Sequence, residues 1–122
     1  MRKHPRIAAQ EPIERARAAW TAGELDDAAR VLERILNRNP DDAAAIHLAG
    51  AVALAAQQPA QAAVFLEKAV QLNPENADFW CDLGTALHAL RNLGAAEQAY
   101  RQTLVLQASH KDGLFNLANV LR

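Results

Sequence analysis

A 34-residue repeat constrains the fold of this chain more than any other feature of its sequence. Residues 39–42 read Asn-Pro-Asp-Asp and recur as Asn-Pro-Glu-Asn at residues 73–76, and an alanine-rich run follows each copy. A period of this length is typical of solenoid proteins, in which each repeat buries its apolar face against its neighbours. The chain is therefore expected to be a stack of similar units.

The apolar residues within each repeat follow a helical period. In the block that starts at Ala77, the side chains of Trp80, Leu83 and Leu87 stand at i, i+3 and i+7, so they share one helical face. Turn-forming residues divide each block near its middle. These breaks are Gly23, residues 57–59 and residues 91–94. Each block is thus predicted to hold two helices.

The end of the second helix also has a sequence signal. Pro40 and Pro74 follow the first two of these helices and are expected to terminate them. The third block has Ala108 at the equivalent place, so its second helix is predicted to extend by one or two further residues.

Small and large residues alternate in fixed columns when the blocks are aligned. Small residues stand in one column at Ala16, Gly50, Gly84 and Ala118 and in another at Ala28, Ala62 and Ala96, and large ones stand at Leu32, Leu66 and Tyr100. The alternation predicts closely packed helix pairs, in which the helical glycines allow a neighbouring helix to approach.

These columns identify a resemblance. The pattern Trp80-x2-Leu83-Gly84-x2-Leu87, followed by Ala96-x3-Tyr100, resembles the tetratricopeptide repeat, whose pattern also has a proline where Pro40 and Pro74 stand. The resemblance implies an all-α, right-handed superhelical solenoid of antiparallel helix pairs. Its repeats would be residues 9–42, 43–76 and 77–110, with a half-repeat at 111–122 and a flexible basic tail at 1–8.

The first block departs most from the family pattern. Pro12 replaces the usual tryptophan and Arg15 the usual leucine. A terminal repeat has one face without a neighbour, so a polar outer surface is expected there.

The resemblance also implies a concave groove lined by the first helix of each repeat. The predicted groove residues are Arg17, Trp20, His47, Leu48, Ala51, Leu54, Cys81, Asp82, Thr85, His88, Phe115, Asn116 and Asn119. Their apolar centre and polar ends suit a peptide that inserts one or two apolar side chains. The alternative is a solvated structural face without a ligand.

Two known modes of peptide capture in this family fit poorly. The two-carboxylate clamp of lysine, asparagine and arginine is replaced by Ile13, Arg17 and Leu48, which argues against a receptor for chaperone tails. The asparagine ladder at the sixth position of each block is matched by Asn116 alone. Residues 115–119 nevertheless resemble repeats that precede catalytic domains in bacterial transferases.

The sequence gives little support for catalysis or metal binding by this chain. His47, Cys81 and His88 share one predicted wall and suggest either metal ligands or a thiolate with a base. Equivalent positions in packed helices lie about 10 Å apart, which is too far for shared coordination, and a fourth ligand is not evident. The sequence predicts no catalytic residue, no metal site, no cofactor and no enzymatic activity.

The net charge and the hydropathy of the chain limit the kinds of partner that it is expected to bind. The formal net charge is −1, which argues against non-specific binding to nucleic acid or to an anionic membrane surface. No apolar run approaches the roughly 18 residues of a membrane span. Cys81 is the only cysteine, so an internal disulfide is excluded and a cytoplasmic location is predicted.

The predicted function is a non-catalytic interaction module that binds a peptide segment of a partner protein. The last twelve residues leave an alternative open, because Leu117, Val120 and Leu121 give that helix an apolar face. Either the chain is the N-terminal part of a larger protein, or it associates with itself through this end as a homo-oligomeric scaffold.

Overall fold

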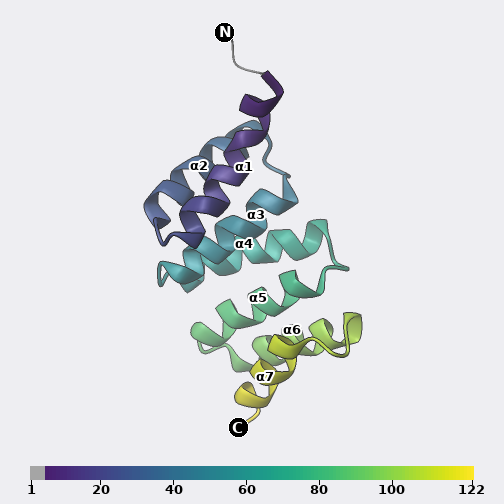
Figure 1. Ribbon diagram of the computed structural model, residues 1–122. Coiled ribbons are helices and arrows are strands. Elements are labelled where there is room, and N and C mark those ends of the chain that lie inside the picture. The colour runs from purple at the N-terminus through teal and green to yellow at the C-terminus, as the bar shows by residue number, and fades with distance from the viewer. Residues whose placement is uncertain (1–4) are drawn as a thin grey trace.

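The computed structural model describes the backbone of residues 5–122 and the side chains of residues 12–122, and Figure 1 shows this part as seven α-helices. The helices are α1 (Pro5–Thr21), α2 (Leu25–Arg38), α3 (Ala43–Ala55), α4 (Pro59–Leu72), α5 (Ala77–Ala89), α6 (Leu93–Leu106) and α7 (Lys111–Val120). The described part contains no strand, so the predicted all-α class is confirmed. None of its helices combines the length and apolar character required to cross a membrane.

The helices stack in the order of the sequence (Figure 1). Each packs against the next one along the chain, and α1, α3, α5 and α7 also make contact in succession. We call these four the A helices and α2, α4 and α6 the B helices. The A helices therefore form a continuous layer, whereas the backbones of the B helices in the described chain lie farther apart.

The start of α1 differs from the predicted boundary. The sequence suggested a flexible tail over residues 1–8, but α1 begins at Pro5, so residues 5–8 are helical. Residues 1–4 lie outside the described residues. Pro12 lies inside α1, where its ring nitrogen donates no helical hydrogen bond.

The B helices end in register. Their last residues, Arg38, Leu72 and Leu106, are spaced by the repeat period. The prediction that α6 extends because a proline is missing is therefore wrong. In place of a proline, a cap on the next helix marks the boundary. The His110 side chain caps α7 by accepting a hydrogen bond from the Gly113 N–H at 2.9 Å.

The same cap position is used at the start of α3 and α5. Asp42 accepts a hydrogen bond from the Ala45 N–H at 3.1 Å, and Asn76 accepts one from the Phe79 N–H at 3.2 Å. These caps satisfy amide groups that lack a partner in the first helical turn. The repeat thus fixes where each A helix after the first begins.

The turn inside each repeat has a common backbone conformation. Gly23, Gln57 and Arg91 have φ angles of 81°, 64° and 66°, in the left-handed region. This confirms the three predicted breaks. Only the first break uses glycine, the residue that adopts this conformation without a steric penalty.

The alternating small and large columns meet inside each repeat. A Cβ atom built on Gly50 would lie 2.6 Å from Leu66 Cγ, and one built on Gly84 would lie 2.6 Å from Tyr100 Cε1. Both distances are too short for real contacts. The predicted role of these glycines, close approach of the B helix to the A helix, is confirmed.

Candidate peptide-binding groove

Successive A helices are joined by a column of paired side chains. At the junction of α3 and α5, His47 Nε2 lies 2.6 Å from Asp82 Oδ2. At the junction of α5 and α7, Asn116 Nδ2 donates to Cys81 Sγ at 3.8 Å. Both pairs join residues 35 apart, so the fifth position of one A helix meets the sixth position of the next.

The first junction has an apolar version of this pair. Leu48 belongs to the buried cluster shared by α1, α2 and α3, and Ile13 packs against that cluster. The chemistry of the column therefore changes from apolar, to histidine with carboxylate, to thiol with amide. The side chains that join the A helices therefore differ from junction to junction although the paired positions repeat.

The His47–Asp82 pair is partly open to solvent. The two side chains keep 27% and 35% of their surface exposed. The imidazole also stacks on the Phe79 ring, with 4.5 Å between the ring centroids. The ring is thereby held in place beside the carboxylate, within reach of solvent.

Two predicted groove residues are not available to a ligand. Leu48 is 2% exposed and Cys81 is 4% exposed, which corrects the prediction that both face outward. Leu48 packs in the core of the first two repeats, and Cys81 packs with Ala96 and Tyr100. Each is covered because the neighbouring A helix contacts this side of its own helix.

Burial also determines the chemistry of Cys81. Loss of solvent, followed by the nearby charge of Asp82, raises the pKa of the Cys81 thiol to about 11. The group is therefore a neutral thiol at physiological pH, which disfavours the thiolate that nucleophilic chemistry requires.

The structure separates the other members of the proposed metal or thiolate site. His47 pairs with Asp82 rather than with Cys81. Across the described residues, no three His, Cys, Asp or Glu side chains are grouped so that they could hold a metal ion. His88 lies elsewhere, beside Thr85 and Ala89.

A depression of about 590 Å³ lies at the carboxyl end of α5. Its lining residues are Thr85, His88, Ala89, Arg91 and Leu93. Sequence reasoning assigned Thr85 and His88 to the groove, but not Arg91 and Leu93, which follow α5 in the turn and at the start of α6. Arg91 could have been found by aligning the turns, since it occupies the left-handed position of Gly23.

Thr85 is held in place from two sides. Its hydroxyl donates to the Cys81 carbonyl at 3.1 Å and accepts from the Tyr100 hydroxyl at 3.3 Å. The wall of the depression is thereby tied to the interior of the third repeat.

The remaining predicted groove residues differ in exposure. Arg17 is exposed, Trp20 is 39% exposed, and Ala51 and Leu54 are half-buried against the core. On α7, Phe115 is 67% exposed, and Asn116 and Asn119 are half-buried. The accessible apolar surface therefore lies toward the two ends of the A-helix layer, not at its centre as predicted.

The apolar face of α7 is divided in a similar way. Leu117 and Val120 turn inward against the cluster that contains Cys81 and Tyr100. Leu114 and Leu121 are 49% and 53% exposed. Of the three residues predicted for self-association, Leu121 alone is thus an exposed residue.

Sequence reasoning missed a second histidine–carboxylate pair. His110 Nε2 lies 2.7 Å from Asp78 Oδ1, so the cap of α7 is also tied to the first turn of α5. The histidine is 8% exposed. Aligning the cap column of Asp42 and Asn76 would have drawn attention to His110, but not to its partner.

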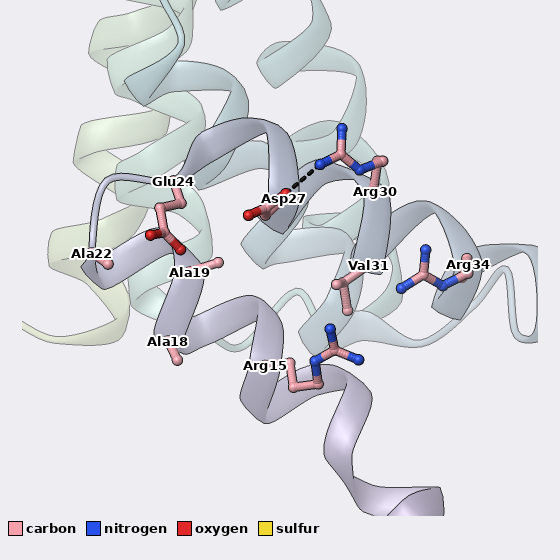
Figure 2. Close-up of a pocket in the computed structure, with 9 residues that line it drawn as sticks. All are labelled: Arg15, Ala18, Ala19, Ala22, Glu24, Asp27, Arg30, Val31 and Arg34. Atoms are coloured by element: carbon pink, nitrogen blue, oxygen red, sulfur yellow. Dashed lines mark hydrogen bonds and ion pairs between the residues drawn. The ribbon is translucent and has the colours of Figure 1, made fainter.

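Figure 2 shows a further depression, of about 520 Å³, between α1 and α2. The guanidinium groups of Arg15 from α1 and Arg34 from α2 both lie near Val31, and Arg30 pairs with Asp27. This polar rim fits the outer surface expected of a first repeat. It is separate from the residues predicted for the groove.

Family models confirm the repeat assignment. Two models described as tetratricopeptide repeat match residues 13–52 and 53–112. The chain belongs to the tetratricopeptide repeat family. A search of curated proteins finds no significant match to this tetratricopeptide repeat chain.

Solved tetratricopeptide repeat structures share the fold. The first such domain of Spaghetti (RPAP3), bound to the HSP90 peptide SRMEEVD, superimposes with a TM-score of 0.89 at 19% identity, covering 93% of this chain and 90% of that chain. The second domain of human RPAP3, in complex with the HSP70 peptide SGPTIEEVD, gives 0.89 at 19% identity, with 98% and 99% covered.

A bacterial enzyme contains a similar stack of repeats. The O-GlcNAc transferase of Thermobaculum terrenum superimposes with a TM-score of 0.88 at 24% identity. The match covers 99% of this chain and 23% of the transferase. At these low identities, the superpositions show that this chain shares its fold with the two RPAP3 domains and with the repeats of the transferase.

Proposed function

We propose that this chain is a non-catalytic interaction module that binds a peptide segment of a partner protein along its A helices. The observation that carries the proposal is the depression beside α5, where Thr85, His88 and Arg91 present a hydroxyl, an imidazole and a guanidinium around the apolar Leu93. A site of this kind suits a short segment with one apolar side chain and neighbouring carbonyl or carboxylate groups.

Other parts of the A-helix layer would contact the same segment. Trp20 at one end and Phe115 at the other expose aromatic surface, and the His47–Asp82 pair lies between them in the sequence of junctions. Aromatic side chains are frequent anchors of binding energy at interfaces. A peptide that runs along this layer would therefore meet different chemistry at each repeat.

The ligand is expected to differ from the chaperone peptides bound by the two RPAP3 domains. The positions at which clamp residues would stand hold Ile13, Arg17 and Leu48, and Leu48 is buried. A single arginine cannot hold the two carboxylates of a chaperone tail as three polar side chains would.

The test uses two alanines that are exposed on the A helices. Ala55→Arg and Ala89→Arg place large charged side chains at equivalent positions of α3 and α5 without replacing a buried group. We expect a partner recovered from native lysate by the wild type to be lost with this double variant. Thr85 is unsuitable for this purpose, because it bonds to Tyr100.

The matched control places arginine on a B helix. Val105→Arg changes a residue of α6 that is 76% exposed, so partner binding is expected to persist. Equal recovery of the partner by wild type and by the A-helix double variant would refute peptide binding at this site.

A homo-oligomeric scaffold is the second candidate, and the exposed surface of α7 favours it. Leu114, Phe115 and Leu121 leave three large apolar side chains in solvent. Self-association through them predicts that Leu114→Glu/Leu121→Glu lowers the mass measured by light scattering with chromatography. A monomeric wild type across the micromolar range would exclude this candidate.

A further inference from the structure

The B-helix side of the solenoid contains a groove that the peptide site does not involve. It lies between α2 and α4, whose backbones do not approach each other closely, and has a volume of about 560 Å³. Its floor comes from Val52 and Ala53 of α3 and from Ala56 directly after that helix, and one wall carries the half-buried Phe65.

Comparison with the next repeat explains why this groove is open. One period later along the chain, Ala53 and Ala56 are replaced by the larger Leu87, which is half-buried against the core, and Leu90, which is 41% exposed. The aromatic side chain is replaced there by Ala99, which is 3% exposed.

The residues along the edge show the same difference. Ala29 and Leu36, on the α2 edge, are exposed and half-buried. Their counterparts on α4, Ala63 and Val70, are 7% and 6% exposed. The α2 edge of the groove therefore keeps apolar surface accessible at two positions whose counterparts on α4 are buried.

Charge on the rim restricts what can occupy the groove. Asp26 and Glu33 line the α2 edge, and Gln58 and Gln61 line the α4 edge. No lysine or arginine is among its lining residues. An occupant with basic side chains would meet complementary charge, and an acidic one would be repelled.

The walls also restrict the backbone conformation of the occupant. Helical walls have no free backbone edge, so an extended peptide cannot add to them as a strand does to a sheet. The α2 wall runs from Leu25 to Leu36, about 17 Å along a helix axis at 1.5 Å per residue. Another helix of roughly eleven residues can pack against a trough of this length.

From this geometry we infer that the groove between α2 and α4 binds a helical segment of a partner protein that presents a row of apolar side chains flanked by lysine or arginine. The apolar row packs on the half-buried Leu36, Ala56 and Phe65, and the basic side chains lie over Asp26 and Glu33. The surface is distinct from the A-helix site, so the chain can hold two partners at once.

The test titrates the full chain into a fluorescein-labelled synthetic helical peptide with leucine at i, i+3, i+4 and i+7 and lysine elsewhere. A second peptide with glutamate in place of lysine serves as the charge control. We expect saturable one-to-one binding of the lysine peptide, and at least about tenfold weaker binding of the glutamate peptide. Failure of the lysine peptide to saturate would overturn the inference.

Filling the groove provides the structural control. Ala53→Leu/Ala56→Leu introduces the residues that the next repeat already has there, and it is expected to weaken lysine-peptide binding at least about tenfold. Ala55→Leu/Ala89→Leu makes the same chemical change at exposed A-helix positions and should leave the affinity unchanged. Equal binding by the filled variant would place the peptide elsewhere and overturn the inference.

A charge variant covers the case in which the filled variant does not fold. Asp26→Asn/Glu33→Gln changes two exposed side chains and is expected to weaken binding several-fold at low salt, less so at high salt. Unchanged affinity at low salt would contradict the assigned rim. Arginine at Ala55 and Ala89 is expected to abolish A-helix binding without affecting this peptide, so the two sites can fail separately.

Discussion

The interior of each repeat and the junctions between A helices are built by different rules. Inside a repeat, a small A-helix residue receives a large B-helix side chain, as Gly84 receives Tyr100, and the pairing recurs with little change. Between A helices the paired positions also recur, but their chemistry changes at every junction. The packing inside a repeat is thus conserved along the chain, whereas the side-chain pairs that join neighbouring A helices differ.

The largest effect is expected from removing a repeat-interior side chain. Tyr100→Ala takes away a ring that is 1% exposed and should lower the free energy of unfolding by about 3–5 kcal/mol, because the cavity cannot be refilled by neighbouring side chains. Phe115→Ala, at a position 67% exposed, should change it by less than about 0.5 kcal/mol. Urea denaturation measures both. Similar losses would show that the interior does not dominate stability.

A junction residue gives the next prediction. Because the pKa of Cys81 is about 11 rather than 9.0, its thiolate fraction at pH 8 is about a hundredfold lower than in the unfolded chain. Alkylation by iodoacetamide in native buffer should therefore be at least about a hundredfold slower than in urea at the same pH. Fast native alkylation would mean that the contact between α5 and α7 opens readily.

The same shift predicts alkaline destabilisation. Cys81 has a higher pKa folded than unfolded, so the folded state holds the proton more tightly between pH 9 and 11. Stability is fully present below pH 9 and falls as pH rises through this range. Burial also raises the pKa of Tyr100, which adds to the fall. Thermal unfolding at several pH values would test the sign, with Cys81→Ala removing the thiol contribution.

Glycine substitutions test the repeat interior with smaller changes. Gly84→Ala introduces a methyl group against the Tyr100 ring and should cost about 1–3 kcal/mol of stability, since the buried ring has little room to move. Gly94→Ala, in the first turn of α6, meets no atom within 4 Å and should stabilise by up to about 1 kcal/mol. Changes of the same sign would contradict close packing at Gly84.

Prediction from the sequence was most successful where every repeat has the same side-chain packing. The glycine and tyrosine columns, the turns and the helix order could be predicted because each block must satisfy the same packing. Aligning caps would also have located the start of α7 at His110. The extension of α6 was mispredicted because one absent proline was given more weight than the cap that follows it.

The candidate site was less predictable, because exposure on an A helix depends on the neighbouring repeat. Leu48 and Cys81 occupy positions that face outward in the family pattern, yet the adjoining A helix covers them. The pairing of His110 with Asp78 likewise joins positions 32 residues apart. Such contacts depend on how the helices approach, which a periodic pattern does not specify.

The smallest effect on stability is expected from the histidine–carboxylate pair between α3 and α5. His47 and Asp82 are partly solvated, so a double-mutant cycle with His47→Ala and Asp82→Ala should give a coupling of about 0.5–1 kcal/mol, as is usual for such pairs. His47→Ala also removes the stacking on Phe79, which the cycle cancels because that loss occurs in both backgrounds. A coupling above about 2 kcal/mol would make this junction as important to stability as the repeat interior. The expected weak coupling would instead mean that contact between the imidazole and the carboxylate adds little to stability, and that the packing of the helices carries this junction.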